Sequence, residues 1–416
     1  GSGGTVTPPP AQASPFSVPQ NILDGLCYIY TYDKRNNLVE KKIPGKDWEH
    51  IVYDKLNRPV LTQDANLRLD NQWLFTKYDV FDRPVYTGLV VDSRERDVIQ
   101  TELYDYPSNS YALAEEKTNA SNAFVNDGLN IYYTKDAFPT SNFEVLTVNY
   151  YDDYDFDKKG ISTTTHANAI VPTSMHLQLN LQEDFTENTK TLPTGSHVKV
   201  LETNSWITTL TLYDHKARPI YTHSINDFLQ SEDISNIELD FTGNPLETHN
   251  KHIKFDDVSS TTSTTTIVDK FTYDHALRLL KQTQEINGQA EELIVFNEYD
   301  ELGQLKQKKV GGNDTQDEYS QTNALQDIDY SYNIRGWLTD INDVTDSDPN
   351  KLFAFNLRYN NPDLDNSTTP LYNGNISETH WKTENTSNDI RSYGYEYDAL
   401  NRLNSAHYLT PHNMTV

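Results

Sequence analysis

The sequence contains one cysteine, no long apolar run and few basic residues for its 416 positions. Cys27 alone excludes a disulfide within the chain, and it does not identify the compartment, because an extracellular protein built on a continuous sheet needs no such bridge. No stretch of the sequence approaches the roughly 18 apolar residues of a membrane helix. The 34 basic residues face 61 acidic ones, giving a net charge of −27. Such a surface repels phosphate backbones and disfavours nucleic-acid binding, whereas it favours solubility and basic partners.

The sequence also lacks the motifs of common catalytic and metal sites. It has no nucleophile elbow, phosphate-binding loop, dinucleotide-binding glycine motif or zinc-protease histidine pair. His249 and His252 lie close in sequence without an evident third ligand, so we expect both on the surface. Carboxylate pairs for glycoside hydrolysis stay open, because 61 acidic residues form many accidental pairs. We expect no enzyme activity, no catalytic residue, no metal and no cofactor.

The densest acidic cluster has Asp153, Asp155 and Asp157 at alternate positions, as in a calcium-binding loop. An EF-hand loop requires glycine at its sixth position and glutamate at its twelfth, where this segment has Lys158 and Thr164. Two interpretations remain: a turn with a solvated acidic edge, which we favour, and a calcium site.

One short phrase recurs eight times, opened by a tyrosine that aspartate usually follows. The tyrosines are Tyr32, Tyr53, Tyr78, Tyr213, Tyr273, Tyr299, Tyr332 and Tyr397. Where copies are closest, their tyrosines lie 21, 25 and 26 residues apart, and longer gaps indicate insertions or decayed copies. Repetition at a period of roughly 20–50 residues is typical of repeat arrays, in which each unit buries its core on its neighbours.

Each copy has the composition of a tight hairpin turn. The fourth residue after the tyrosine is Asn, Asp or Gly in six of eight copies, and these residues most readily accept a positive φ. The aspartate can accept backbone N–H bonds from the residues ahead, and an arginine at the fifth position can pair with it across the turn. The sixth residue is Leu or Pro in every copy, and proline suits the start of a strand.

We assign a structural role to these repeated residues, because a turn is needed at every repeat whereas a catalytic group is needed once. Besides the eight tyrosines they are Asp33, Asp54, Asp79, Asp214, Asp274, Asp300 and Asp398, with Arg58, Arg83, Arg218, Arg278, Arg335 and Arg402. Tyr28, Tyr30 and Tyr32 alternate with the period of a strand, which places them on one face. The sequence therefore predicts a mostly β chain of hairpins. The best helical signal is Ser224–Gln230, with Ser224 as its N-cap.

The repeated phrase, Tyr-Asp-x-x-[Asn/Gly/Asp]-Arg-[Leu/Pro], resembles the YD-repeat signature of the RHS (rearrangement hotspot) family. The wider phrases GLCYIYTYDKRNNLVEKKIPG, LYDHKARPIYT and IDYSYNIRGWLTDIN are similar to those of large secreted RHS proteins of Bacteroidota-type bacteria. The resemblance implies a β-hairpin ribbon that spirals into part of a hollow shell, or cocoon. In polymorphic toxins such a shell holds a C-terminal toxic domain, and related shells occur in insecticidal toxin complexes and teneurins.

The chain departs from the family at its end. Family members close the shell with a Pro/Gly/Asp-rich core segment, often a self-cleavage site, which is not found before Val416. We therefore assign no autoproteolytic residue and no toxin activity to this chain. We expect it to begin and end within a longer protein.

The sequence suggests five parts. Residues 1–20 resemble a linker and residues 21–103 hold three close-set repeats. Residues 104–205 are less regular, with decayed copies expected at Tyr104 and Tyr151. Residues 206–342 hold further repeats and an insertion near 225–265, where Ser259–Val268 suits an exposed loop with a strand at its Thr-rich end. Residues 343–416 contain further shell strands and a last repeat, truncated before the core segment.

The leading functional hypothesis is a non-enzymatic RHS shell segment that encapsulates or carries a C-terminal toxin in a secreted polymorphic toxin of interbacterial competition. It implies a secreted or cell-surface location. The expected partners are a toxin passenger, in the same or a separate chain, and secretion-system or surface lipoprotein components, without nucleic acid or a membrane span. One alternative is a cell-surface adhesin or glycan-binding protein whose tyrosines form stacking platforms. Another is a two-layer β-sandwich hydrolase or lectin with a solid core and one cleft.

Overall fold

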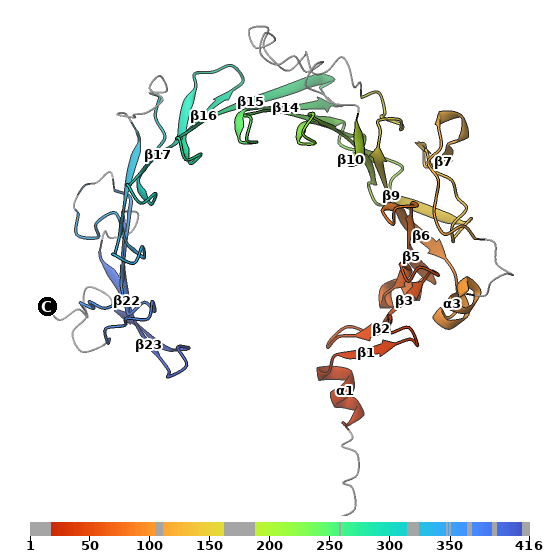
Figure 1. Ribbon diagram of the computed structural model, residues 1–416, viewed down its shortest axis with the longest axis horizontal. Helices are drawn as coiled ribbons and strands as arrows, with labels where there is room; N and C mark the ends of the chain where they lie inside the picture. The colour runs from red at the N-terminus through yellow and green to blue at the C-terminus, as the bar shows by residue number, and fades with distance from the viewer. Residues whose placement is uncertain are drawn as a thin grey trace, which may run out of the picture. The chain divides into compact units, whose positions relative to one another are not determined.

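A computed structural model describes residues 18–104, 111–161, 188–257, 259–313, 324–346, 348, 351–363, 368–384 and 389–409 (Figure 1). The described part is mostly β-strand, which confirms the predicted fold class. Apart from β7 (Phe124–Asn126) and β8 (Leu129–Ile131), its strands belong to one antiparallel sheet of 22 strands. The chain divides into two compact units. The first comprises Gly1–Thr163, Phe185–Ala217 and His223–Ser231, and the second comprises the rest.

In the first unit, each strand of the main sheet pairs antiparallel with the next one along the chain, with β6 passing directly to β9. The strands are β1 (Ile29–Tyr32), β2 (Leu38–Lys42), β3 (Glu49–Tyr53), β4 (Pro59–Gln63), β5 (Gln72–Tyr78), β6 (Pro84–Val91), β9 (Phe143–Asp152), β10 (Thr189–Lys199) and β11 (Trp206–Tyr213). The helices are α1 (Gln20–Leu26), α2 (Ala65–Leu69) and α3 (Arg96–Tyr104), with a 3-10 turn at Ala120–Asn122. Figure 1 shows these strands side by side from red β1 to yellow β9.

The second unit continues the same pattern, and its strands pair in chain order from β14 to β24. They are β13 (Ser231–Leu239), β14 (Pro245–Asp256), β15 (Thr261–Tyr273), β16 (Leu279–Ile286), β17 (Glu292–Tyr299), β18 (Leu305–Val310), β19 (Gln326–Tyr332), β20 (Leu338–Ile341), β21 (Phe353–Arg358), β22 (Glu378–Thr383), β23 (Arg391–Tyr397) and β24 (Leu403–Leu409). Strand β12 (Pro219–Asn226) contributes residues to both units.

The first unit has an aromatic core on one face of its sheet. Phe75 and Tyr86 are fully buried. The segment between β6 and β9, which includes β7 and β8 and which we call the excursion, packs Phe124 and Tyr133 against Tyr86. Further along the sheet, Phe156 lies on the backbone of β10 at Gly195, where a Cβ atom would come within 2.1 Å of the ring. Glycine is therefore required there by close approach.

The second unit has a polar row on one face of its sheet. Asp340, Asn356, His380 and Ser392 are successive cross-strand partners on β20 to β23. Asn356, His380 and Ser392 are buried; Ser392 Oγ lies 2.7 Å from His380 Nδ1, and Glu378 Oε2 lies 3.2 Å from His380 Nε2. The Ser392 contact joins β23 to β22 and the Glu378 contact lies within β22, and together they give both ring nitrogens of the buried His380 a partner.

Three local predictions are wrong. The segment Ser224–Gln230 is the end of β12 and a hairpin turn, in which Asn226 Oδ1 accepts the N–H groups of Phe228 and Leu229 at 3.1 and 3.0 Å. Tyr104 is the last residue of helix α3, whereas the predicted copy required it to end a strand. The strand predicted at the Thr-rich end of Ser259–Val268 is present, but β15 already begins at Thr261, so the predicted loop is wrong for most of the segment, where pairing with β14 outweighs the loop-like composition. In each case sheet pairing or packing overrides local propensity.

The predicted positive φ at the fourth position is confirmed in all eight copies. The φ values are 64° at Asn36, 62° at Asn57, 63° at Asp82, 61° at Ala217, 62° at Leu277, 85° at Gly303, 77° at Gly336 and 60° at Asn401. Proline at the sixth position begins β4, β6 and β12, also as predicted. Ala217 and Leu277 adopt the left-handed conformation although their side chains disfavour it, so the hairpin imposes the conformation.

Leu277→Asn should stabilise the second unit. Asparagine tolerates the left-handed region better than leucine, so the free energy of unfolding should rise by about 0.5–1 kcal/mol. Urea denaturation followed by circular dichroism measures the change. Leu302→Asn is the matched control, since Leu302 is exposed in the next turn and has no positive φ. An equal or larger shift in the control would contradict the explanation.

Candidate functional site

The repeated turns form the candidate site, and each is built around its aspartate. Asp54 Oδ1 accepts the backbone N–H groups of Leu56 and Arg58, both at 2.9 Å. Its Oδ2 atom accepts the Arg58 Nε–H at 2.8 Å. The same three bonds occur at Asp79, Asp274 and Asp398. Bonds from the backbone and side chain of Arg402 lower the pKa of Asp398.

In three of the remaining copies the fifth residue or the aspartate differs, but the side chain that follows the tyrosine still accepts backbone N–H bonds. Asp33, Asp300 and Asn333 each accept N–H bonds from the second and fourth residues ahead. Asp214 accepts the Lys216 N–H at 2.8 Å. Two predicted arginines reach beyond their own turn: Arg218 donates to the carbonyl of Asp240 at 2.9 Å and Arg335 to that of Tyr372 at 2.7 Å.

Consecutive turns are joined at what we call junctions, where the tyrosine of one turn meets the strand that leaves the preceding turn. In the described chain, eight tyrosine hydroxyls donate to a backbone carbonyl that follows the preceding turn. Six of these carbonyls belong to the first residue of a strand, whereas Pro193 lies within β10 and Ile376 lies just before β22. The pairs are Tyr53–Leu38, Tyr78–Pro59, Tyr151–Pro84, Tyr213–Pro193, Tyr273–Pro245, Tyr299–Leu279, Tyr359–Leu338 and Tyr397–Ile376, at 2.6–3.0 Å. Tyr332 makes no such bond within the described residues.

The fifth-position arginine completes several junctions. The guanidinium of Arg58 lies 4.6 Å from the ring centroid of Tyr78, and those of Arg83 and Arg278 lie 4.4 Å from Tyr151 and Tyr299. Because its aspartate also holds each arginine, one side chain links its own turn to the ring of the next. Such a cation–π contact contributes about 0.5–1 kcal/mol when exposed.

The junctions also share one strand register. The residue three places before the tyrosine is always opposite the residue two places after the acceptor carbonyl. The eight pairs are His50–Glu40, Phe75–Leu61, Val148–Tyr86, Leu210–Gly195, Lys270–Glu247, Phe296–Lys281, Asn356–Asp340 and Gly394–Glu378. Asp329 and Gln307, beside Tyr332, pair in the same register without the hydroxyl bond. The register is therefore a property of the repeat and does not depend on the length of the chain between copies.

One complete turn, Leu239–Pro245, was not predicted from the sequence. Asp240 Oδ1 accepts the N–H groups of Gly243 and Asn244 at 2.6 and 2.9 Å, and Gly243 has a φ of 106°. The signal was the spacing of Asp240, Gly243 and Pro245, which was hidden because leucine stands in the place of tyrosine.

Two other turns are interrupted by insertions. Tyr151, expected as a decayed copy, does join the preceding turn, and the chain returns to the pattern at Pro193. Tyr359 behaves in the same way, with the return at Ile376. Insertions of this length hide the repeat from any fixed-period search.

A buried ion pair anchors the excursion of the first unit to its sheet. Lys77 Nζ donates to Glu115 Oε1 at 2.8 Å and to the carbonyl of Ala137 at 2.9 Å, and both charged side chains are fully inaccessible to solvent. Glu115 also accepts the Tyr86 hydroxyl at 3.0 Å and the Thr134 hydroxyl at 2.6 Å. Burial lowers the pKa of Lys77 to about 8, although the nearby charge and hydrogen bond of Glu115 act to raise the pKa. No sequence signal marked this pair.

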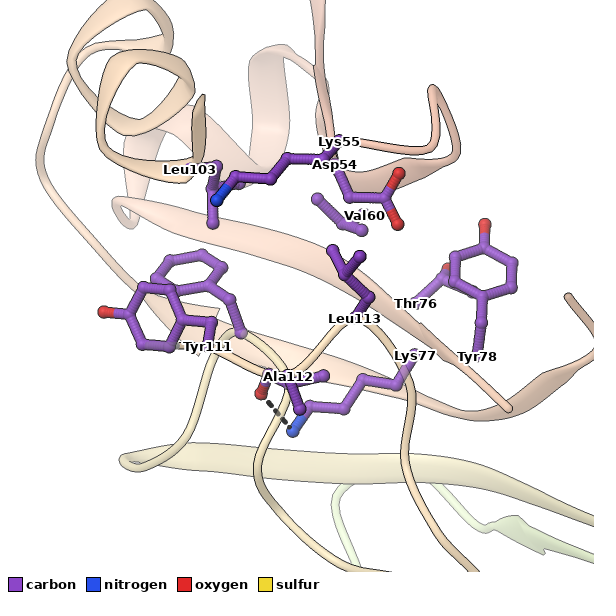
Figure 2. A pocket seen from close by; sticks show the side chains of 12 residues that line it. Asp54, Lys55, Val60, Thr76, Lys77, Tyr78, Leu103, Tyr111, Ala112 and Leu113 are labelled. Atoms are coloured by element: carbon purple, nitrogen blue, oxygen red, sulfur yellow. Dashed lines mark hydrogen bonds between the residues drawn. The ribbon is translucent and has the colours of Figure 1, made fainter. Parts of the chain in front are cut away.

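Lys77 also lines a small cavity beneath the same excursion. Figure 2 shows Lys77 with Tyr111, Leu113 and Val60 around it. The volume of this cavity is about 30 Å³, which is room for a water molecule or two. Pockets that bind small organic ligands are roughly ten times larger or more. This cavity is therefore a packing feature of the core.

Larger hollows lie on the second unit. One of about 690 Å³ is lined by polar residues that include Asp329, Asp340, Asn356 and Arg358. Another of about 380 Å³ is lined in part by Tyr395, Tyr397 and Asp398. Both are open and polar.

The other candidates from the sequence have ordinary partners. Asp153 contacts Lys117 and caps Asp155, whereas Asp157 accepts from Asn130. His252 is exposed beside Asp233, but His249 is buried 3.1 Å from Glu247, so its predicted surface position is wrong.

The described residues contain neither a candidate metal cluster nor a candidate membrane-spanning helix. No group of three or more His, Cys, Asp or Glu side chains in the described ranges is placed to hold a metal ion. Nor does any helix there combine the length and apolar character needed to cross a membrane.

No family model and no curated protein matches the chain. Similar solved structures include crystal structures of TcdB2-TccC3-Cdc42, of TcdB2-TccC3-TEV and of TcdB2-TccC3 without its hypervariable C-terminal region. Their sequence identities with this chain are 11%, 12% and 12%, and their TM-scores are 0.25, 0.20 and 0.22. They cover 93%, 92% and 92% of this chain, which spans 16%, 23% and 23% of theirs. Similarity at this level carries nothing about function.

Tyr299→Phe should destabilise the second unit by about 1 kcal/mol, the usual contribution of one hydrogen bond. The change removes the donor to the Leu279 carbonyl and retains the ring under Arg278. Tyr372→Phe is the matched control, because that side chain is exposed and its hydroxyl has no described partner. Urea denaturation of the two variants measures the difference. Equal effects would show that the junction bond contributes nothing specific.

Lys77→Met should destabilise the first unit by about 3–5 kcal/mol, because it leaves the Glu115 carboxylate buried without its counter-ion. The double variant Lys77→Met, Glu115→Gln removes both charges and should recover much of that loss. A double-mutant cycle on unfolding free energies measures the coupling. Additive effects would contradict a direct ion pair.

Proposed function

We propose that this chain is a wall segment of an RHS-type shell that encloses or carries a toxin passenger. The observation that carries the proposal is the junction, because it extends a sheet by one hairpin at a time in a constant register. Such a sheet can grow into a wall of any length without a new core for each repeat. The resemblance of the repeated phrase to YD repeats supports the same function.

The proposed wall acts by exclusion and has no chemistry of its own. An aspartate–arginine ion pair recurs within four of the described turns and stabilises each of them. A net charge of −27 suits contact with a basic passenger or partner. The wall would serve a secreted or cell-surface toxin in competition between bacteria, with secretion or surface lipoprotein components as further partners. A Bacteroidota-type origin is part of the proposal and rests on the wider repeat phrases alone.

A second function is favoured by an aromatic stripe on the second unit. Trp381 stacks on Tyr393 with ring centroids 5.7 Å apart, and Tyr393 lies 5.1 Å from Tyr408, which is exposed. Aromatic faces of this kind also bind sugars in lectins. The alternative is therefore an adhesin or glycan-binding surface, which predicts sugar binding by this chain alone.

Limited proteolysis of the polypeptide that contains this chain and its passenger tests the enclosure. The intact wall should protect the passenger, so that it is digested several-fold more slowly than the same passenger produced alone. Lys77→Met should weaken the wall and restore fast digestion. Lys254→Met is the matched control, because Lys254 is exposed on β14.

A passenger that is digested as fast inside the protein as outside it would refute enclosure. Glycan-array binding of the isolated chain that is lost in Trp381→Ala would instead favour the adhesin. The two readouts use different samples, so each hypothesis can fail separately.

A further inference from the structure

The larger of the two hollows on the second unit is lined by a buried amide that lacks a partner. Asn356 of β21 lines this hollow and is 5% exposed. Its Nδ2 atom donates to the Thr339 carbonyl at 3.3 Å and to Asp340 Oδ1. Its Oδ1 atom has no hydrogen-bond partner among the described residues. Because an unpaired buried oxygen costs free energy, a ligand that brings a donor to this oxygen is stabilised here.

The carboxylate of Asp340 lies beside this amide and lines the same hollow. Asp340 and Asn356 are direct cross-strand partners on β20 and β21, and such partners have Cβ atoms about 4.5–5.5 Å apart. Asp340 is half-buried, and Asn356 is the one partner of its carboxylate within the described ranges. The hollow therefore presents a charged acceptor next to a neutral one, and neither is fully satisfied.

The charge of the lining favours a cation. Four aspartates line the hollow against one lysine and one arginine. Both basic side chains already have a carboxylate partner. Lys351 Nζ lies 2.8 Å from Asp329 Oδ2, and the Arg358 guanidinium lies 2.6 Å from Asp363 Oδ2. A positive group from outside therefore meets an excess of negative charge in the hollow.

We propose that this hollow binds the guanidinium group of an arginine from a partner polypeptide, which donates to the Asp340 carboxylate and to Asn356 Oδ1. A guanidinium carries its N–H donors in a planar fork and has no acceptor, which suits two neighbouring acceptors. A lysine ammonium is a point charge and fits this pair less well. A metal ion is disfavoured, because no three ligating side chains in the described part of the chain are placed to hold one.

The inference deepens the proposed function, because it gives a binding site to the basic passenger or partner that the net charge of −27 suits. It rests on that function only for the source of the arginine. The hollow has a volume of about 690 Å³, so it also holds residues that flank the arginine in an extended segment. Its chemistry is the same whether the arginine comes from the passenger or from another protein.

Peptide titration of the unaltered chain tests the ligand class. The probes are short peptides of glycine and serine that carry one arginine, one lysine or one citrulline, and citrulline has nearly the shape of arginine without its charge. Isothermal titration calorimetry measures the Kd of each peptide. We expect the arginine peptide to bind several-fold more tightly than the lysine peptide and the citrulline peptide to bind most weakly. An arginine peptide that binds no more tightly than the other two, or does not bind, would overturn the proposal.

Asp340→Asn should weaken binding of the arginine peptide several-fold, because it removes the charge and nearly retains the shape. Asp257→Asn is the matched control, since it removes the same charge from an exposed residue between β14 and β15, outside the hollow. Equal effects would show that binding follows only the overall charge and would contradict the site. The peptide comparison uses the unaltered chain, so it decides the proposal even if Asp340→Asn fails to fold.

The same titration on the polypeptide that contains the passenger identifies the source of the arginine. If the passenger supplies it, the hollow is already filled, and the arginine peptide should bind several-fold more weakly than to the isolated chain. Undiminished binding would retain the site and assign its arginine to a separate partner chain. A passenger protected from proteolysis without any peptide binding would refute only this inference, whereas peptide binding with an unprotected passenger would refute only enclosure.

Discussion

The hydrogen bond from a tyrosine hydroxyl to the backbone carbonyl of the preceding turn is the interaction on which this architecture depends. A sheet with few buried apolar side chains, as in the second unit, has little else to fix how one hairpin lies on the next. The hydrogen bond to the carbonyl fixes the position of the tyrosine ring, and the arginine of the preceding turn packs over that ring, as Arg278 does over Tyr299. This contact accompanies the constant register at eight junctions, and strand pairing alone keeps the same register beside Tyr332.

The contact also explains how the chain tolerates insertions. Between Tyr151 and Pro193, and again between Tyr359 and Ile376, the polypeptide leaves the repeat and returns to the same register. Loop closure becomes only slowly more costly with length, so a strong local junction can absorb such excursions. The first unit has a further stabilising contact, the buried Lys77–Glu115 ion pair, which holds the excursion against the sheet.

The turn chemistry could be predicted from sequence because every interaction within it is local. Asp54 and Arg58 lie four positions apart, and the positive φ at Asn57 follows from the same few residues. Predictions that depended on the surroundings were less reliable. The residues near Ser224 have helical propensity but belong to a hairpin, and the buried partner of Lys77 lies in an excursion without any periodic signal. The Leu239 turn was not predicted because the repeated phrase is defined by a tyrosine, which this turn lacks.

The sequence by itself determined the hairpin, its left-handed residue and the strand that follows, since these depend on contacts within about seven residues. The partner of each tyrosine was decided only in three dimensions. The hydroxyl of Tyr151 bonds the carbonyl of Pro84, which lies far away in sequence across α3 and β7. Such a contact exists because neighbouring strands bring distant residues to a fixed separation, and the spacing of the repeats along the chain does not encode it.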